Sequence, residues 1–144
     1  MDFGSINWLA VVVCVIFSFI NGFIWYNPKV FYNTWWKAIG RTDADMEKMR
    51  AGNMGLTWAL TALSAIVKAV SMAFMVNSIG AAMPGGVNAL NGASVGLMLW
   101  LGFIAPTYLV NKLFAGHGFK VWAIETGNHL VDLVVFGVIL GAWR

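Results

Sequence analysis

The stretch IETGNHLVDLVVFG, residues 124–137, lies inside a long apolar run and yet carries Glu125, His129 and Asp132. An apolar run of about 20 residues is the length that an α-helix needs to cross the hydrocarbon of a bilayer. Ionisable groups in such a run are costly unless they face water or the interior of a helix bundle. The stretch therefore predicts a membrane-spanning helix with one polar face.

The composition of the whole chain is that of an integral membrane protein. Of its 144 residues, 60% are hydrophobic and 10% are charged, whereas soluble domains carry about 25% charged residues. The mean hydropathy is +0.75, and a water-soluble fold of this length could not bury so much apolar surface. The formal net charge of +3 is small and dispersed along the chain. We therefore expect the lipid bilayer as a partner, and no nucleic acid.

Four apolar runs lie along the chain, each close to the length of one transmembrane helix. None alternates like a membrane β-strand, and a helix satisfies its own backbone groups inside hydrocarbon. The first run has no small-residue cleavage site after it, which favours a retained span over a signal peptide. We expect an all-α membrane protein, a four-transmembrane-helix bundle forming a single domain over residues 1–144, with spans at roughly 6–26, 56–79, 93–111 and 122–143.

The loop between the first two spans contains its own helical pattern. Phe31, Trp35 and Ile39 recur at helical spacing, which predicts a short helix in the membrane interface with Trp35 and Trp36 at headgroup depth. Thr42 and Asp45 then have the spacing of a capping box that opens a further turn of helix.

Basic residues are concentrated in two of the loops. Seven lie in the first and third loops, whereas Arg144 alone lies on the other side. Because cytoplasmic loops carry the excess of Lys and Arg, this distribution predicts that both of these loops are cytoplasmic and both termini extracytoplasmic. The seven residues are Lys29, Lys37, Arg41, Lys48, Arg50, Lys112 and Lys120.

The polar residues of the second and fourth spans predict a buried ion pair. At about 100° per residue, Glu125, His129 and Asp132 fall within an arc of about 60°, with Asn128 at its edge. Lys68 lies near the centre of the second span and matches Asp132 in depth and in charge. We predict a Lys68–Asp132 pair at the midplane, on the helix face that also carries Thr57, Thr61, Ser64 and Ser71.

Further polar residues predict a pocket on the cytoplasmic side of this pair. Asn21 in the first span and Thr107 and Asn111 in the third lie at the depth of Glu125 and His129. The outer half of the fourth span, by contrast, has no polar side chain before Trp143. We therefore expect a polar pocket that opens towards the cytoplasm, ends at the ion pair and is closed on the outer side.

Two other uses of these polar groups are open. Intramembrane polar side chains can simply hold helices together, at about 0.6 kcal/mol per hydrogen bond. Glu125 and His129 could share a metal ion, but Asp132 lies about 10 Å along the helix from Glu125, and no second histidine lies in a span. No nucleophile motif or phosphate-binding loop is present. We expect no metal and no cofactor, and the pattern favours a protein that is not an enzyme.

Two pairs of glycines have the GxxxG spacing that lets membrane helices approach closely. They are Gly92 with Gly96 in the third span, and Gly137 with Gly141 in the fourth. The Gly137–Gly141 face points away from Asp132, so it is free to meet another helix or another subunit. We expect a homo-oligomer.

Residues 7–40, NWLAVVVCVIFSFINGFIWYNPKVFYNTWWKAIG, resemble the start of a bacterial membrane-protein family catalogued as domain of unknown function 1761. The resemblance implies a small protein of the bacterial inner membrane with this length and four-span layout, and it implies no known activity. The residues that carry it are Asn7, Trp8, Leu9, Ala10, Gly22, Trp25, Tyr26, Pro28, Phe31 and Trp35.

The sequence thus favours a small membrane protein that binds or translocates a small solute, ion or proton through a charged intramembrane pocket. The alternative is a structural or accessory membrane protein without transport, whose polar groups only specify helix packing. A hydrated pocket distinguishes the first function from the second.

Overall fold

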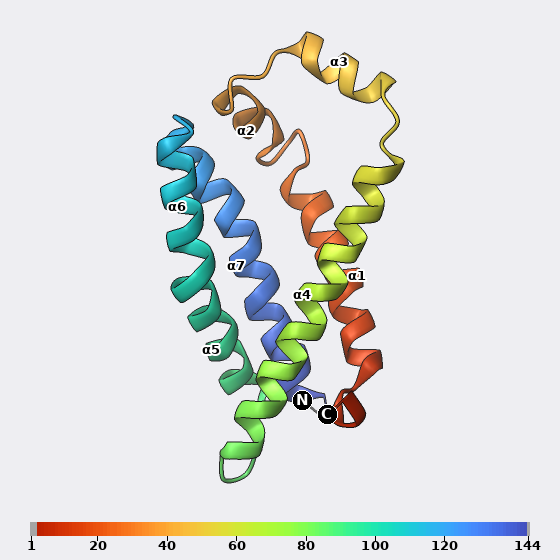
Figure 1. Cartoon of the computed structure of the whole chain (residues 1–144), viewed down its shortest axis with the longest axis vertical. Coiled ribbons are helices and arrows are strands. Elements are labelled where there is room, and N and C mark those ends of the chain that lie inside the picture. Colours follow the sequence, from red (N-terminus) through yellow and green to blue (C-terminus); the bar gives the residue numbers. More distant parts are fainter. Residues whose placement is uncertain (1–2, 144) are drawn as a thin grey trace.

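The computed structural model describes residues 3–143, which form helices joined by turns (Figure 1). Met1, Asp2 and Arg144, the one basic residue predicted on the side opposite the two basic loops, lie outside the described residues. The predicted fold class, an all-α protein with four helices long and apolar enough to cross a membrane, is confirmed.

The four spans lie where the apolar runs predicted them. They are α1 (Trp8–Trp25), α4 (Gly55–Ala82), the composite helix Ala89–Phe114 and α7 (Gly118–Ala142). The last three begin before or end after the predicted runs, so each of these helices is a few residues longer than the run that predicted it. Helix α7 is the central one, since it packs against α1, α4 and both parts of the composite helix.

The two ends of the bundle carry different connections (Figure 1). Both termini and the α4–α5 turn lie at one end, which we call the terminal end. The α6–α7 turn and the short helices α2 (Tyr32–Ala38) and α3 (Asp43–Ala51) lie at the opposite end, which we call the loop end. The seven basic residues of the first and third loops therefore lie at or beside the loop end.

The third span is interrupted. It consists of α5 (Ala89–Leu99), a π-helical turn η2 (Trp100–Ile104) and α6 (Ala105–Phe114), which has Pro106 in its first turn. Proline has no backbone N–H and crowds the preceding turn, so a helix that contains it must adjust locally. The wider π turn makes this adjustment and rotates α6 relative to the face that α5 presents.

The loop between α1 and α4 forms the predicted local structures. Helix α2 carries the two tryptophans, and Gly40 follows it with a φ of +77°, a backbone conformation that favours glycine. The capping box before α3 is confirmed, because Asp45 N donates to Thr42 Oγ1 (3.3 Å) and Thr42 N donates to Asp45 Oδ2 (2.9 Å).

The buried apolar core lies towards the terminal end. Small residues such as Ala10, Cys14 and Ala69 let α1, α4 and α7 approach, and Met72, Val76 and Phe136 fill the space between them. On the outside, many large apolar side chains are exposed, among them Leu56, Leu90 and Phe114. Lipid covers such a surface in a membrane protein.

The two glycine pairs meet each other across the contact between α5 and α7. A methyl group added to Gly92 would collide with the carbonyl oxygen of Gly137, and one added to Gly137 would collide with that of Gly92. Gly96 lies against the backbone of Leu133 in the same way, and Gly141 against the backbone of Asn88. The glycines therefore bring two helices of one chain into backbone contact, and they no longer argue for a homo-oligomer, which stays a prediction.

Candidate functional site

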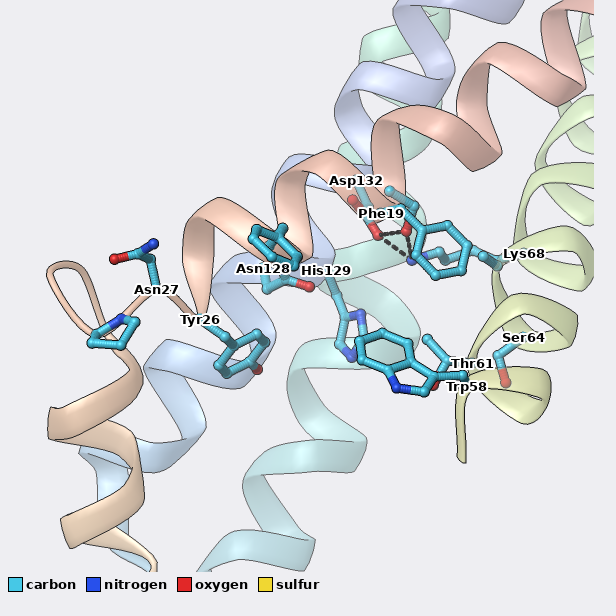
Figure 2. A pocket seen from close by; sticks show the side chains of 15 residues that line it. Phe19, Tyr26, Asn27, Trp58, Thr61, Ser64, Lys68, Asn128, His129 and Asp132 are labelled. Carbon is cyan, nitrogen blue, oxygen red and sulfur yellow. Dashed lines mark hydrogen bonds and ion pairs between the residues drawn. The ribbon is translucent and has the colours of Figure 1, made fainter. Parts of the chain in front are cut away.

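Lys68 and Asp132 form an ion pair between α4 and α7, as Figure 2 shows. The first span completes the contact. Ser18 Oγ donates to Asp132 Oδ2 (2.7 Å) and accepts from Lys68 Nζ (3.3 Å), while Asn21 Nδ2 donates to Asp132 Oδ1 (2.9 Å). The Asp132 side chain is 2% exposed and that of Lys68 is 25% exposed. The carboxylate is therefore enclosed by donors, whereas part of the ammonium is accessible.

The accessible side of Lys68 faces a cavity of about 550 Å³. This volume is within the range of about 300–1,000 Å³ that small-molecule sites occupy. Side chains from α1, α4 and α7 converge on the same space (Figure 2). The lining residues are Ser18, Phe19, Gly22, Phe23, Tyr26, Asn27, Pro28, Trp58, Thr61, Ser64, Ala65, Lys68, Asn128, His129 and Asp132.

The helical repeat explains how three spans supply this lining. On α1, Ser18 and Gly22 are four residues apart and lie on one face, and Tyr26 directly after the helix continues that row. On α4, Thr61, Ser64 and Lys68 lie at intervals of three and four residues. Thr57 and Ser71, which belong to the same predicted stripe, do not line the cavity. Only the part of the predicted polar face of α4 between Thr61 and Lys68 thus lines the cavity.

Asn128 contributes a buried polar group that has no partner. The residue is 8% exposed and lines the cavity. Its Nδ2 atom has no hydrogen-bond partner among the described residues, although its backbone oxygen accepts from Asn21 Nδ2 (3.3 Å). Buried amides are nearly always hydrogen-bonded, so the amide nitrogen of Asn128 is an exception that has a donor available.

Glu125 lies apart from the ion pair and has its own partners. Glu125 Oε2 lies 2.7 Å from Lys112 Nζ, and its Oε1 accepts from Trp35 Nε1 (3.0 Å). Glu125 does not line the cavity, so the prediction from the sequence that it lines the pocket is wrong. It instead ties α2 and α6 to α7.

His129 does line the cavity, and Tyr108 of α6 contacts its imidazole ring. Tyr108 Oη and His129 Nε2 are 3.2 Å apart, and the two rings meet edge to face.

The indole of Trp36, expected at headgroup depth, is buried and donates to the carbonyl of Thr42 (2.9 Å). Both tryptophans of α2 therefore bond within the chain.

The placement of Thr107 and Asn111 in the pocket is a further correction. Both side chains are exposed, and neither lines the cavity. Helix α6 turns Ala105, Tyr108 and Lys112 towards α7 instead, because the π turn before it shifts the face that follows. The predicted depth of Thr107 and Asn111 follows from the rise per residue of a regular helix. That rise does not determine towards which neighbour their side chains point.

Sequence reasoning also missed the aromatic wall of the cavity and the partners on α6. In the sequence, Phe19, Phe23 and Trp58 do not differ from the other apolar residues of a span. Tyr108 and Lys112 are four residues apart, as are Glu125 and His129 on the neighbouring antiparallel helix. That matched spacing across a short turn is a signal from which both contacts could have been predicted.

Within residues 3–143, no group of three His, Cys, Asp or Glu side chains lies close enough to hold a metal ion together. The arrangement instead offers hydrogen-bond donors and one accessible ammonium at the inner end of a largely apolar cavity. It can hold a small molecule by its polar end, or carry an exchangeable proton at His129 or Lys68.

No curated protein matches the chain, and no solved structure matches it. One family model does match, and its range runs through the fourth span, far beyond the N-terminal quarter in which the resemblance is visible by eye. The chain therefore belongs to the family described as "Protein of unknown function (DUF1761)", whose model matches residues 9–141.

Proposed function

We propose that this protein binds or translocates a small solute, ion or proton through the cavity that ends at Lys68 and Asp132. One observation carries the proposal. The ion pair is not sealed by packing, because Lys68 is a quarter exposed at the inner end of a cavity of about 550 Å³. A charge inside a membrane that remains accessible to a cavity is typical of substrate and ion pathways.

The direction of the opening also belongs to this proposal. From the ion pair the cavity extends to Asn27 and Pro28, at the loop end, where the basic residues of the first and third loops gather. Because Lys and Arg mark cytoplasmic loops, we place the cavity opening in the cytoplasm and both termini outside, in a bacterial inner membrane. Reporter fusions after residue 143 test this, and cytoplasmic reporter activity there would reverse the orientation.

The structural role is supported by a different observation. Asp132 accepts from Ser18, Asn21 and Lys68, and Glu125 is held by Lys112 and Trp35, so both carboxylates contribute to helix packing. A protein whose polar groups only specify packing would need no cavity beside them. The two functions therefore differ in whether water reaches Lys68.

Thiol labelling distinguishes them. In a Cys14→Ser background, Ser64→Cys places a thiol on the cavity wall, and Leu63→Cys places one on the neighbouring exposed face that does not line the cavity. A membrane-impermeant reagent added from the loop end should label position 64 about tenfold faster than position 63, because a thiol reacts as its thiolate, which needs water. Equal rates, or two inert positions, would contradict the proposal and favour the packing role.

A further inference from the structure

The inner end of the cavity offers hydrogen-bond donors and no free carboxylate. Asp132 Oδ1 accepts from Asn21, and its Oδ2 accepts from Ser18 and Lys68. With three donors around it and 2% of its side chain exposed, Asp132 is not available to a ligand. A cation in the cavity would meet the ammonium of Lys68 before it met any anion.

The ammonium of Lys68 has a donor to spare. It carries three hydrogens, of which Asp132 and Ser18 accept two. On the core side the ammonium faces the Phe136 ring, 5.4 Å away, which offers a cation–π contact and no lone pair. The accessible part of the Lys68 side chain lines the cavity.

Asn128 provides the second donor. Asn128 lines the same cavity, and its Nδ2 is enclosed by protein atoms without a partner. A turn of the amide about its Cβ–Cγ bond exchanges Nδ2 and Oδ1 and can present this donor to a ligand. Asn128 precedes Asp132 by one helical turn, about 6 Å along the axis, and Lys68 contacts Asp132. The two residues therefore lie about one helical turn apart along the bundle, a spacing on the scale of one small polar group.

The rest of the cavity is apolar. Phe19, Phe23 and Trp58 form much of its wall, and Tyr26 lies towards the opening. Such walls suit an apolar body and disfavour a sugar or a dianion, whose further polar groups would lose their water without gaining partners. The excess of basic residues at the loop end also raises the local concentration of anions.

We infer that the ligand is an apolar monocarboxylate, whose carboxylate accepts hydrogen bonds from Lys68 Nζ and Asn128 Nδ2. This inference rests on the proposed function. The apolar body of the ligand lies between α1 and α4 against the aromatic wall. Charge-assisted hydrogen bonds of this kind are about twice as strong as neutral ones, so the carboxylate distinguishes the ligand from its neutral analogue.

The test uses calorimetric titration of the full chain in lipid nanodiscs, with empty nanodiscs as the blank. The probes share a naphthalene body and differ in their polar end: 2-naphthoate, 2-naphthalenemethanol and a (2-naphthylmethyl)trimethylammonium salt. We expect 2-naphthoate to bind about tenfold more tightly than the alcohol, and the ammonium salt not to bind above the blank. Palmitate is a fourth probe, since preference for it over 2-naphthoate points to an acid that comes from the bilayer and the reverse to one from water.

Variants of Asn128 identify the site. Asn128→Asp places an anion beside the ligand carboxylate and should weaken 2-naphthoate binding by about 30-fold or more, while Asn128→Ala removes the donor and should weaken it by about tenfold. Asn111→Asp makes the same substitution on the exposed face of α6 and should change the affinity by less than about twofold. The alanine variant serves if the aspartate variant does not fold.

Three results overturn the inference. They are tighter binding of the ammonium salt than of either acid, no binding of either acid to the unsubstituted protein, and equal losses from the changes at positions 128 and 111. If Ser64→Cys is still labelled faster than Leu63→Cys, only the ligand class is wrong and the proposed function stands. If that difference is also absent, both are wrong.

Discussion

The two halves of this bundle are built from the same four spans and differ in how closely the helices approach. At the terminal end, Gly92 and Gly137 bring the backbones of α5 and α7 into contact, and Ala10, Cys14 and Ala69 line the core of α1, α4 and α7. At the loop end, larger aromatic residues stand between α1 and α4 and leave a cavity of about 550 Å³.

The ion pair marks the boundary between these halves. Phe136, one turn further towards the terminal end, is fully buried in the core, whereas Asn128, one turn towards the loop end, lines the cavity. Small residues thus close the bundle at the terminal end, and bulky or polar residues border the cavity at the loop end. The comparison suggests substitutions that act on one half without acting on the other.

The largest expected effect comes from breaking the ion pair at the boundary. Lys68→Met leaves Asp132 as a buried charge without a counter-ion, and Asp132→Leu does the same to Lys68. Each single change should lower the free energy of unfolding in detergent by about 3–5 kcal/mol. The double variant should lose less than the sum of the two, because neither charge is then stranded. Thermal melting of all four proteins measures this, and additive losses would remove the pair from the boundary.

A smaller loss is expected from opening the closed half. Gly92→Leu forces a side chain into the backbone of Gly137, and over-packing of this kind costs about 1–3 kcal/mol or more. Gly102→Leu is the matched control on the same span, because nothing lies within 4 Å of a methyl group added there. Melting temperatures should fall for the first variant and stay near the unsubstituted value for the second. Similar values for both variants would mean that the glycines do not close this half.

The smallest effect concerns α3 at the loop end. The backbone N–H and the hydroxyl of Thr42 donate to Asp45, and they hold the pKa of this carboxyl below its usual value of 3.8. Because the pKa is lower in the folded state, the capping box stabilises α3 above about pH 4, and this contribution is lost as the pH falls through the folded pKa. The protection factors of the α3 amides, which are corrected for the intrinsic pH dependence of exchange, should therefore fall in acid, and Asp45→Asn should remove this fall. An unchanged fall in that variant would assign it to another group.

Much of the fold could be predicted from local patterns in the sequence. Span positions follow from apolar runs, the cap of α3 follows from the spacing of Thr42 and Asp45, and the depth of Lys68 matches that of Asp132 in a regular helix. In each case the signal lies within one helix or between two helices of known rise. Such signals do not depend on how the helices rotate when they pack, so they can be read from the sequence.

The rest depended on how the helices rotate about their axes. The π turn before Pro106 directs Tyr108 and Lys112 inwards and Asn111 outwards, and no regular helical wheel shows this. Lys112 then binds Glu125, which removes that carboxylate from the cavity. Aromatic lining residues were equally hidden, because a phenylalanine that faces lipid and one that faces a cavity look alike in a membrane span.

Hydration of Lys68 is the most direct difference between the open and the closed half. Solid-state NMR of ¹⁵N-lysine-labelled protein in bilayers can measure how fast polarisation passes from water to each ammonium, with the Lys68 signal assigned by Lys68→Arg. If the loop half is open, Lys68 Nζ should receive polarisation nearly as fast as exposed lysines such as Lys29. Transfer to Lys68 Nζ as slow as transfer to the backbone amide of Lys68, which lies inside α4, would mean that the cavity is dry, and would contradict a ligand site at this pair.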